Sequence, residues 1–170
     1  GSLLTGALVV LGDQTGLFKA LAGAGAVTPA ELAERSGCHE RYVREWLSGL
    51  AAAGYVAYVG DGRYELPEVQ TIALTDETSP AYVVGGFQAM LAATRAVPTL
   101  AERFRSGDGL GWHEHDPGLF QGTERFFRPG YQANPWQSWL PAVEGVVLKL
   151  QPGARVADVG CGHGASIIIM

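Results

Sequence analysis

The sequence predicts a mainly α-helical chain with a small two-stranded β element, which runs at its C-terminal end into the first strand and helix start of an α/β domain. Residues 27–66 show the pattern of two helices followed by a hairpin, and apolar residues recur at helical spacing on both sides of that segment. Near the C-terminal end, the pattern of a short buried strand at 155–159 is followed by alternating glycines and an Ile-rich stretch. This change of pattern is typical of a strand, a tight turn and a helix.

Composition narrows the class of protein. Hydrophobic residues make up 47% of the 170 residues and charged residues 17%, which is enough apolar surface to bury a core. The formal net charge of −5 argues against a nucleic-acid partner, because phosphate contacts dominate nucleic-acid affinity. No apolar run approaches the roughly 20 residues that span a bilayer, and there is no signal-peptide pattern. Cys38 and Cys161 belong to no C-x-x-C pair. We therefore expect a cytoplasmic protein with no membrane partner and no disulfide framework.

The first element is an apolar helix over residues 3–22. Leu3, Leu4, Leu8 and Leu11 supply more than one apolar face, so the helix should be widely buried. Two interpretations stay open: a helix of the protein's own core, or a helix that packs against the same helix of a partner subunit.

Residues 27–66 predict a winged helix. Thr28 caps a helix whose first position is Pro29, Glu31 completes a capping box, and Gly37 ends the helix. A second helix over 40–53 follows. Its core stripe is formed by residues at i, i+3, i+4 and i+7, namely Val43, Trp46, Leu47 and Leu50. Strands at 55–59 and 63–66 then flank a turn, Gly60-Asp61-Gly62.

A winged helix raises the alternative of a DNA-binding transcription regulator, with the 40–53 helix in the major groove. On that helix, however, Arg41 and Arg44 are balanced by Glu40 and Glu45. The basic stripe expected of a DNA reader is missing. The sequence favours a structural winged helix that serves dimerisation or covers a substrate site.

Apolar helices are expected after a polar break at 75–79. Ser79 and Pro80 predict the start of a helix that reaches residue 97, and Pro98 restarts a helix that Gly107 ends. The pair Gly85-Gly86 lowers helix propensity and indicates either close helix packing or a kink. We expect these helices to pack against residues 3–22.

Residues 107–138 predict an irregular connector, because prolines and glycines interrupt it. Its aromatic residues would pack between two domains or line a pocket, and Trp112, Phe127 and Tyr131 are the candidates for contact with a substrate. Two histidines and two carboxylates lie within residues 112–116, but no third histidine accompanies them, so we assign no metal site. A helix over 139–150 follows. The domains are thus predicted as 1–106, the connector 107–138, and 139–170.

The motif with the clearest chemistry follows the predicted strand. It comprises Asp158, Gly160, Cys161, Gly162, His163 and Gly164. Glycines permit positive φ and a close approach of a ligand to the backbone, and a helix start directs free N–H groups at that ligand. Gly160, Gly162 and Ala165 also satisfy the dinucleotide fingerprint, so a dinucleotide-dependent enzyme remains an alternative. The acidic Asp158 and the late position of the motif in the chain favour a class of enzyme other than the dinucleotide-dependent ones.

The motif resembles the first motif of class I S-adenosylmethionine-dependent methyltransferases. With a winged helix before it, the chain is similar to those with an N-terminal, Rv2258c-like dimerisation domain. Gly16-Leu17-Phe18, the Thr-Pro-Ala-Glu-Leu-Ala run from Thr28 and Asp61-Gly62-Arg63-Tyr64 occur in that family's order.

The resemblance implies S-adenosyl-L-methionine as cofactor, a small-molecule methyl acceptor, and a homodimer formed through the N-terminal helices. It places the 160–164 loop under the cofactor, with Asp158 anchoring the loop or reaching the methionine amine through water. The family's second, ribose-binding strand and its catalytic base would lie further along. No catalytic residue is therefore assigned, His163 included, and we expect the sequence to be the incomplete N-terminal part of such an enzyme, inactive as written. The implied second domain is Rossmann-like.

Overall fold

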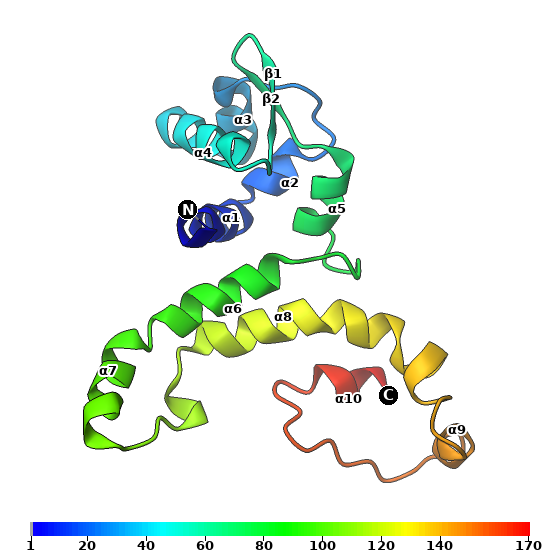
Figure 1. Ribbon diagram of the computed structural model, residues 1–170. Coiled ribbons are helices and arrows are strands. Elements are labelled where there is room, and N and C mark those ends of the chain that lie inside the picture. The colour runs from blue at the N-terminus through cyan, green and yellow to red at the C-terminus, as the bar shows by residue number, and fades with distance from the viewer. Residues whose placement is uncertain (1) are drawn as a thin grey trace.

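The computed structural model describes residues 2–170 and is mainly helical, with one small sheet (Figure 1). In chain order, the elements are α1 (Ser2–Gln14), α2 (Leu17–Leu21), α3 (Pro29–Ser36), α4 (Glu40–Ala52), β1 (Ala57–Gly60), β2 (Arg63–Glu65), α5 (Glu68–Thr75), α6 (Val84–Thr94), α7 (Val97–Ser106), η1 (Trp112–Glu114), α8 (Pro117–Ala133), η2 (Pro135–Trp139), α9 (Val146–Leu150) and α10 (Ala165–Ile169).

The winged helix forms as predicted, because local signals specify each of its ends. The Thr28 hydroxyl accepts a hydrogen bond from the Glu31 N–H at 3.3 Å, and the Glu31 carboxylate accepts one from the Thr28 N–H at 2.7 Å. β1 and β2 pair antiparallel, with Tyr58 opposite Tyr64. The turn between them has positive φ at Gly60, Asp61 and Gly62.

The hydrophobic core lies among α1, α2, α3 and α4. The predicted α4 stripe of Val43, Trp46, Leu47 and Leu50 is buried there. The Trp46 ring meets Phe18 edge to face at 5.0 Å between centroids, and its indole N–H donates to the Leu8 carbonyl at 2.8 Å. The expected 3–22 helix is divided at Gly16, which has φ of 73°.

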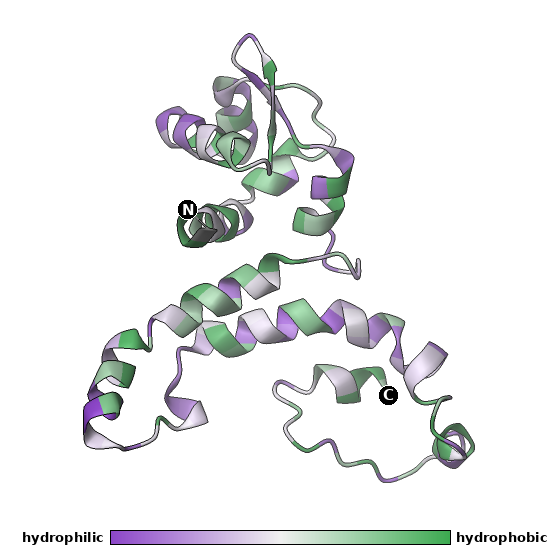
Figure 2. Cartoon of the chain, in the orientation of Figure 1, coloured by the Kyte–Doolittle hydropathy of each residue, from purple (hydrophilic) through white to green (hydrophobic). Residues whose placement is uncertain are grey.

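Helices α6 and α8 lie side by side (Figure 1) and approach each other through glycines. A Cβ on Gly85 would stand 2.5 Å from the Phe126 backbone nitrogen, and a Cβ on Gly122 would stand 2.4 Å from the Ala89 nitrogen. The close packing suggested by the Gly85-Gly86 pair is therefore present. α6 also packs against α1, as expected. α6 is hydrophobic along most of its length, whereas α8 alternates hydrophobic and hydrophilic residues (Figure 2).

Two predictions about this part of the chain are wrong. The helix expected from Pro80 begins at Val84, because the Ser79 hydroxyl accepts from the Ala81 N–H at 3.1 Å in a turn that does not continue as a helix. The connector 107–138 is largely helical: α8 runs for 17 residues. Pro117 occupies its first turn behind the Asp116 cap, and Gly122 is a packing contact. Pro117 and Gly122 therefore do not interrupt the helix.

The C-terminal segment also departs from expectation. Only 146–150 of the predicted 139–150 helix is formed, as α9. Residues 155–159 form no strand and are mostly exposed, Val159 by 97%. A strand is stable only when its N–H and C=O groups have partners, and no segment among residues 2–170 pairs with this one. The helix expected after the glycines is present as α10. The start of a Rossmann-like sheet is thus not seen.

No helix within residues 2–170 is long and apolar enough to cross a membrane.

Candidate functional site

A cavity of about 160 Å³ lies where the glycine loop meets α8 and η1. It brings together the three aromatic candidates and most of the predicted glycine loop, which are distant in the sequence. The lining residues are Trp112, Phe120, Thr123, Glu124, Phe127, Tyr131, Gly160, Cys161, Gly162, His163 and Ala165. Asp158 and Gly164 are outside this lining.

The glycine loop has the backbone shape that only glycine adopts without strain. Gly160, Gly162 and Gly164 have φ of 82°, 56° and 81°. The Gly164 N–H donates to the Cys161 carbonyl at 2.9 Å, which closes the turn before α10. Asp158 holds the loop from outside, because its carboxylate accepts a hydrogen bond from the Ser166 hydroxyl on α10.

Helix α10 keeps the loop near α8, along which it lies (Figure 1). The Trp136 indole N–H donates to the Ile169 carbonyl at 3.0 Å and so joins η2 to α10.

The opposite wall of the cavity is aromatic. Trp112 meets Phe120 edge to face at 5.2 Å between ring centroids, and Phe127 stacks on Tyr131 at 6.3 Å. Phe120, Phe127 and Tyr131 share one face of α8 because they are spaced by seven and four residues. Sequence reasoning missed Phe120 and Glu124 as site residues, since their shared face exists only if residues 117–133 are helical.

One carboxylate stands among the lining residues. Glu124 accepts two hydrogen bonds from Arg128, one turn later on α8: Arg128 Nε donates to Oε1 at 2.6 Å, and Nη2 donates to Oε2. This carboxylate raises the pKa of the Arg128 guanidinium, mainly through the hydrogen bonding. Arg128 therefore stays charged and neutralises Glu124.

On another face of α8, Arg125 fastens the helix to the N-terminal part of the chain. Its guanidinium donates to both oxygens of Asp13, at 2.8 and 3.1 Å, and also to Glu77 and Gln88, both at 2.9 Å. It donates to the Tyr82 hydroxyl as well. The bonds to Asp13 raise the pKa of Arg125, while burial and the charge of Asp13 raise the pKa of Tyr82. The cluster holds α8 against α1 and α6.

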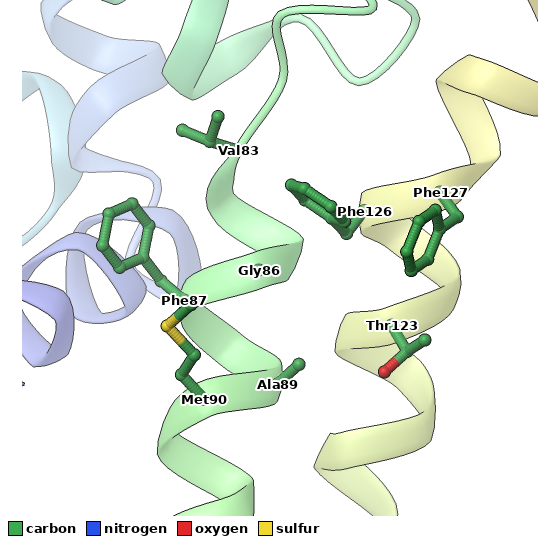
Figure 3. Close-up of a pocket in the computed structure, with 8 residues that line it drawn as sticks. All are labelled: Val83, Gly86, Phe87, Ala89, Met90, Thr123, Phe126 and Phe127. Atoms are coloured by element: carbon green, nitrogen blue, oxygen red, sulfur yellow. The ribbon is translucent and has the colours of Figure 1, made fainter.

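A second, more apolar pocket of about 310 Å³ opens between α6 and α8 (Figure 3). Thr123 and Phe127 belong to the lining of both pockets. Figure 3 shows Phe126 and Phe127 projecting from α8, with Phe87 and Met90 on α6. The Thr123 hydroxyl donates to the Leu119 carbonyl at 2.6 Å, so its proton is already bound within the helix.

The carboxylates of the 112–116 segment serve the fold. Glu114 accepts from the Gly111 N–H at 2.5 Å, and Asp116 accepts from Arg95 at 2.7 Å and lies at the start of α8. Within residues 2–170, no group of three or more His, Cys, Asp or Glu side chains is arranged to hold a metal ion.

The exposed face of α4 carries one ion pair. Arg44 forms an ion pair with Glu40 on the same helix. The charge of Arg44 is thus opposed within the helix, and the absence of a nucleic-acid partner stays a prediction.

Comparison with known proteins defines the class of the N-terminal part. Residues 4–76 match the family model of the Rv2258c-like winged HTH domain, and this segment is such a domain. No curated protein matches the chain.

Two solved structures share its fold. The first is the mitomycin 7-O-methyltransferase MmcR, with 24% identity and a TM-score of 0.56 over 76% of this chain and 41% of that one. The second is PigF, solved with SAH, with 20% identity and a TM-score of 0.59 over 98% of this chain and 51% of that one. The chain spans about half the length of these structures, and at such identities the likeness shows the fold.

Proposed function

We propose that this chain supplies part of the active site of an S-adenosylmethionine-dependent methyltransferase that acts on a small molecule. The observation that carries the proposal is the cavity in which the glycine loop faces the aromatic side of α8. The fold shared with a methyltransferase, and with a protein solved with SAH, supports it.

The loop fits a cofactor at its backbone. Three glycines with positive φ leave no side chain between the main chain and a ligand, which suits Gly160, Cys161, Gly162, His163 and Gly164 to contact the methyl donor. Asp158 keeps the loop in place through Ser166. When bound, S-adenosylmethionine supplies an activated methyl group on a sulfonium.

The aromatic wall suits the acceptor. Trp112, Phe127 and Tyr131 would hold its apolar body and exclude water from the cavity. Methyl transfer is an in-line displacement, so holding the acceptor against the donor supplies much of the rate. No side chain in the cavity is assigned as the catalytic base.

The N-terminal helix supports a homodimer as part of this proposal. Leu3, Leu4 and Leu11 of α1 are exposed, Leu4 by 75%, which is costly for large apolar side chains on one helix. Sedimentation velocity should show a dimer that Leu4→Glu with Leu11→Glu dissociates. A monomer at all concentrations would contradict the proposed homodimer.

A cytoplasmic location stays a prediction.

Calorimetric titration with SAH tests the proposed function. The full-length protein that contains this chain should bind SAH, and Asp158→Ala should weaken binding by about tenfold or more, because a charge-assisted hydrogen bond that shapes the loop is lost. Asp108→Ala is the control, since Asp108 is an exposed loop residue that does not line the cavity. Binding of NAD without binding of SAH would overturn the proposal in favour of a dinucleotide enzyme.

A further inference from the structure

Glu124 occupies a distinctive position in the candidate cavity. It lies on α8 between Phe120, one turn earlier, and Phe127, almost one turn later, and all three line the cavity. Its side chain is only 16% exposed. It is the one carboxylate among the lining residues, so it is the strongest hydrogen-bond acceptor that a side chain offers there.

The Arg128 fork leaves part of that carboxylate free. Each Glu124 oxygen accepts one hydrogen bond from Arg128. A carboxylate has about four lone-pair sites, so each oxygen keeps capacity for a second donor. The fork also holds the carboxylate in one orientation, because a planar guanidinium with two parallel bonds fixes its partner.

The same fork sets the charge that a ligand would meet. Arg128 opposes the charge of Glu124 through two hydrogen bonds, while its Nη1 lies a longer 3.9 Å from Glu77. A cation in the cavity would therefore gain less from the pair than from a free carboxylate, whereas a neutral O–H or N–H would gain a full hydrogen bond. The walls are aromatic rings, which favour a flat apolar body.

We infer that Glu124 is the residue that orients the methyl acceptor, and that the acceptor is an uncharged, flat molecule carrying a hydroxyl or N–H donor. That the bound molecule is a methyl acceptor rests on the proposed function. The selectivity for such a molecule depends only on the residues that line the cavity. Glu124 acts here as a specificity-determining residue, with Arg128 as its positioning residue.

Phenol and toluene test this selectivity, because they match in size and differ in the donor. Their affinities for the full chain are measured by NMR titration of the glycine-loop amides. Glu124→Leu should lower the ratio of phenol to toluene affinity by about tenfold, the effect of one charge-assisted hydrogen bond. Glu102→Leu, at an exposed glutamate of α7, should leave the ratio unchanged. An unchanged ratio in Glu124→Leu overturns the inference.

A second variant tests the charge argument without removing Glu124. Arg128→Met leaves an unneutralised carboxylate, so benzylammonium should bind about tenfold more tightly than to the wild type. Equal affinity would contradict neutralisation by Arg128. The spectrum of each unliganded variant shows whether it is folded.

Repeating the phenol and toluene titrations with saturating SAH separates this inference from the proposed function. If the protein shows phenol selectivity that depends on Glu124 but binds no SAH, the proposed function is contradicted and the inference about Glu124 stands. If it binds SAH without that selectivity, the proposed function stands and the inference about Glu124 is contradicted.

Discussion

The winged helix at 27–66 and the strand at 155–159 were predicted with the same kind of signals, yet only the winged helix forms as expected. In the winged helix, each strand finds its partner within ten residues, and each helix packs against a neighbour in the same core. In the second segment, the 155–159 run has no partner strand among residues 2–170. Local signals therefore succeed where the tertiary partners they assume are nearby, and a strand depends on those partners more than a capped helix does.

The largest expected effect is a difference in stability between substitutions of apolar residues in the two regions. Leu47 is fully buried in the winged-helix core, so Leu47→Ala should lower the free energy of unfolding by about 3 kcal/mol through lost burial and a cavity. Val159→Ala, at an exposed apolar residue of the second region, should change it by less than about 0.5 kcal/mol. Urea unfolding measures both. Equal losses would mean that the second region has a core of its own.

A somewhat smaller effect should appear where α6 meets α8. Gly122→Ala places a Cβ against the α6 backbone and forces the helices apart, which should cost about 2 kcal/mol. Gly130→Ala on the same helix meets nothing within 4 Å and should be neutral or stabilising. Thermal unfolding compares the pair. Tolerance of Ala at 122 would show that the two helices are not held at this distance.

The capping box offers a milder test of local specification. Thr28→Ala removes the hydroxyl that accepts from the Glu31 N–H, and it should destabilise the fold by about 1 kcal/mol. Thr78→Ala is the control, because it removes an exposed hydroxyl that donates to the Asp76 side chain after α5 and satisfies no N–H at the start of a helix. An unchanged denaturation midpoint in Thr28→Ala would indicate that tertiary packing alone determines the start of α3.

The smallest effect is visible only at high pH. Burial raises the pKa of Tyr82 above its ordinary value near 10, so the folded chain keeps a proton that the unfolded chain loses. The stabilisation is complete below that ordinary value and is lost as pH rises above it. The free energy of unfolding of the wild type should fall more steeply above pH 10 than that of Tyr82→Phe. Parallel slopes would contradict a neutral, buried Tyr82 hydroxyl.

The sequence alone was sufficient for the winged helix and the glycine loop, because capping residues, glycines with positive φ and helical spacing act over a few residues. It was insufficient for α8, because Pro117 and Gly122 are typical of loops as well as of a helix start and a close helix contact. Glu124 was missed for the same reason: its place beside Phe120 and Phe127 follows only once α8 is known. The aromatic candidates Trp112, Phe127 and Tyr131 do line the cavity, although in a helical setting rather than the connector that was expected.

The contact at Gly85 and Gly122 has a consequence for laboratory evolution of this protein. Because main chain touches main chain at Gly85 and Gly122, no smaller side chain could replace these two residues and adjust the helix spacing gradually. Variation in ligand preference can then come from the α8 residues that line the glycine-loop cavity, Phe120, Glu124 and Phe127, of which Phe127 also lines the pocket between α6 and α8. A saturation library confined to those three positions would explore binding while leaving the scaffold constant.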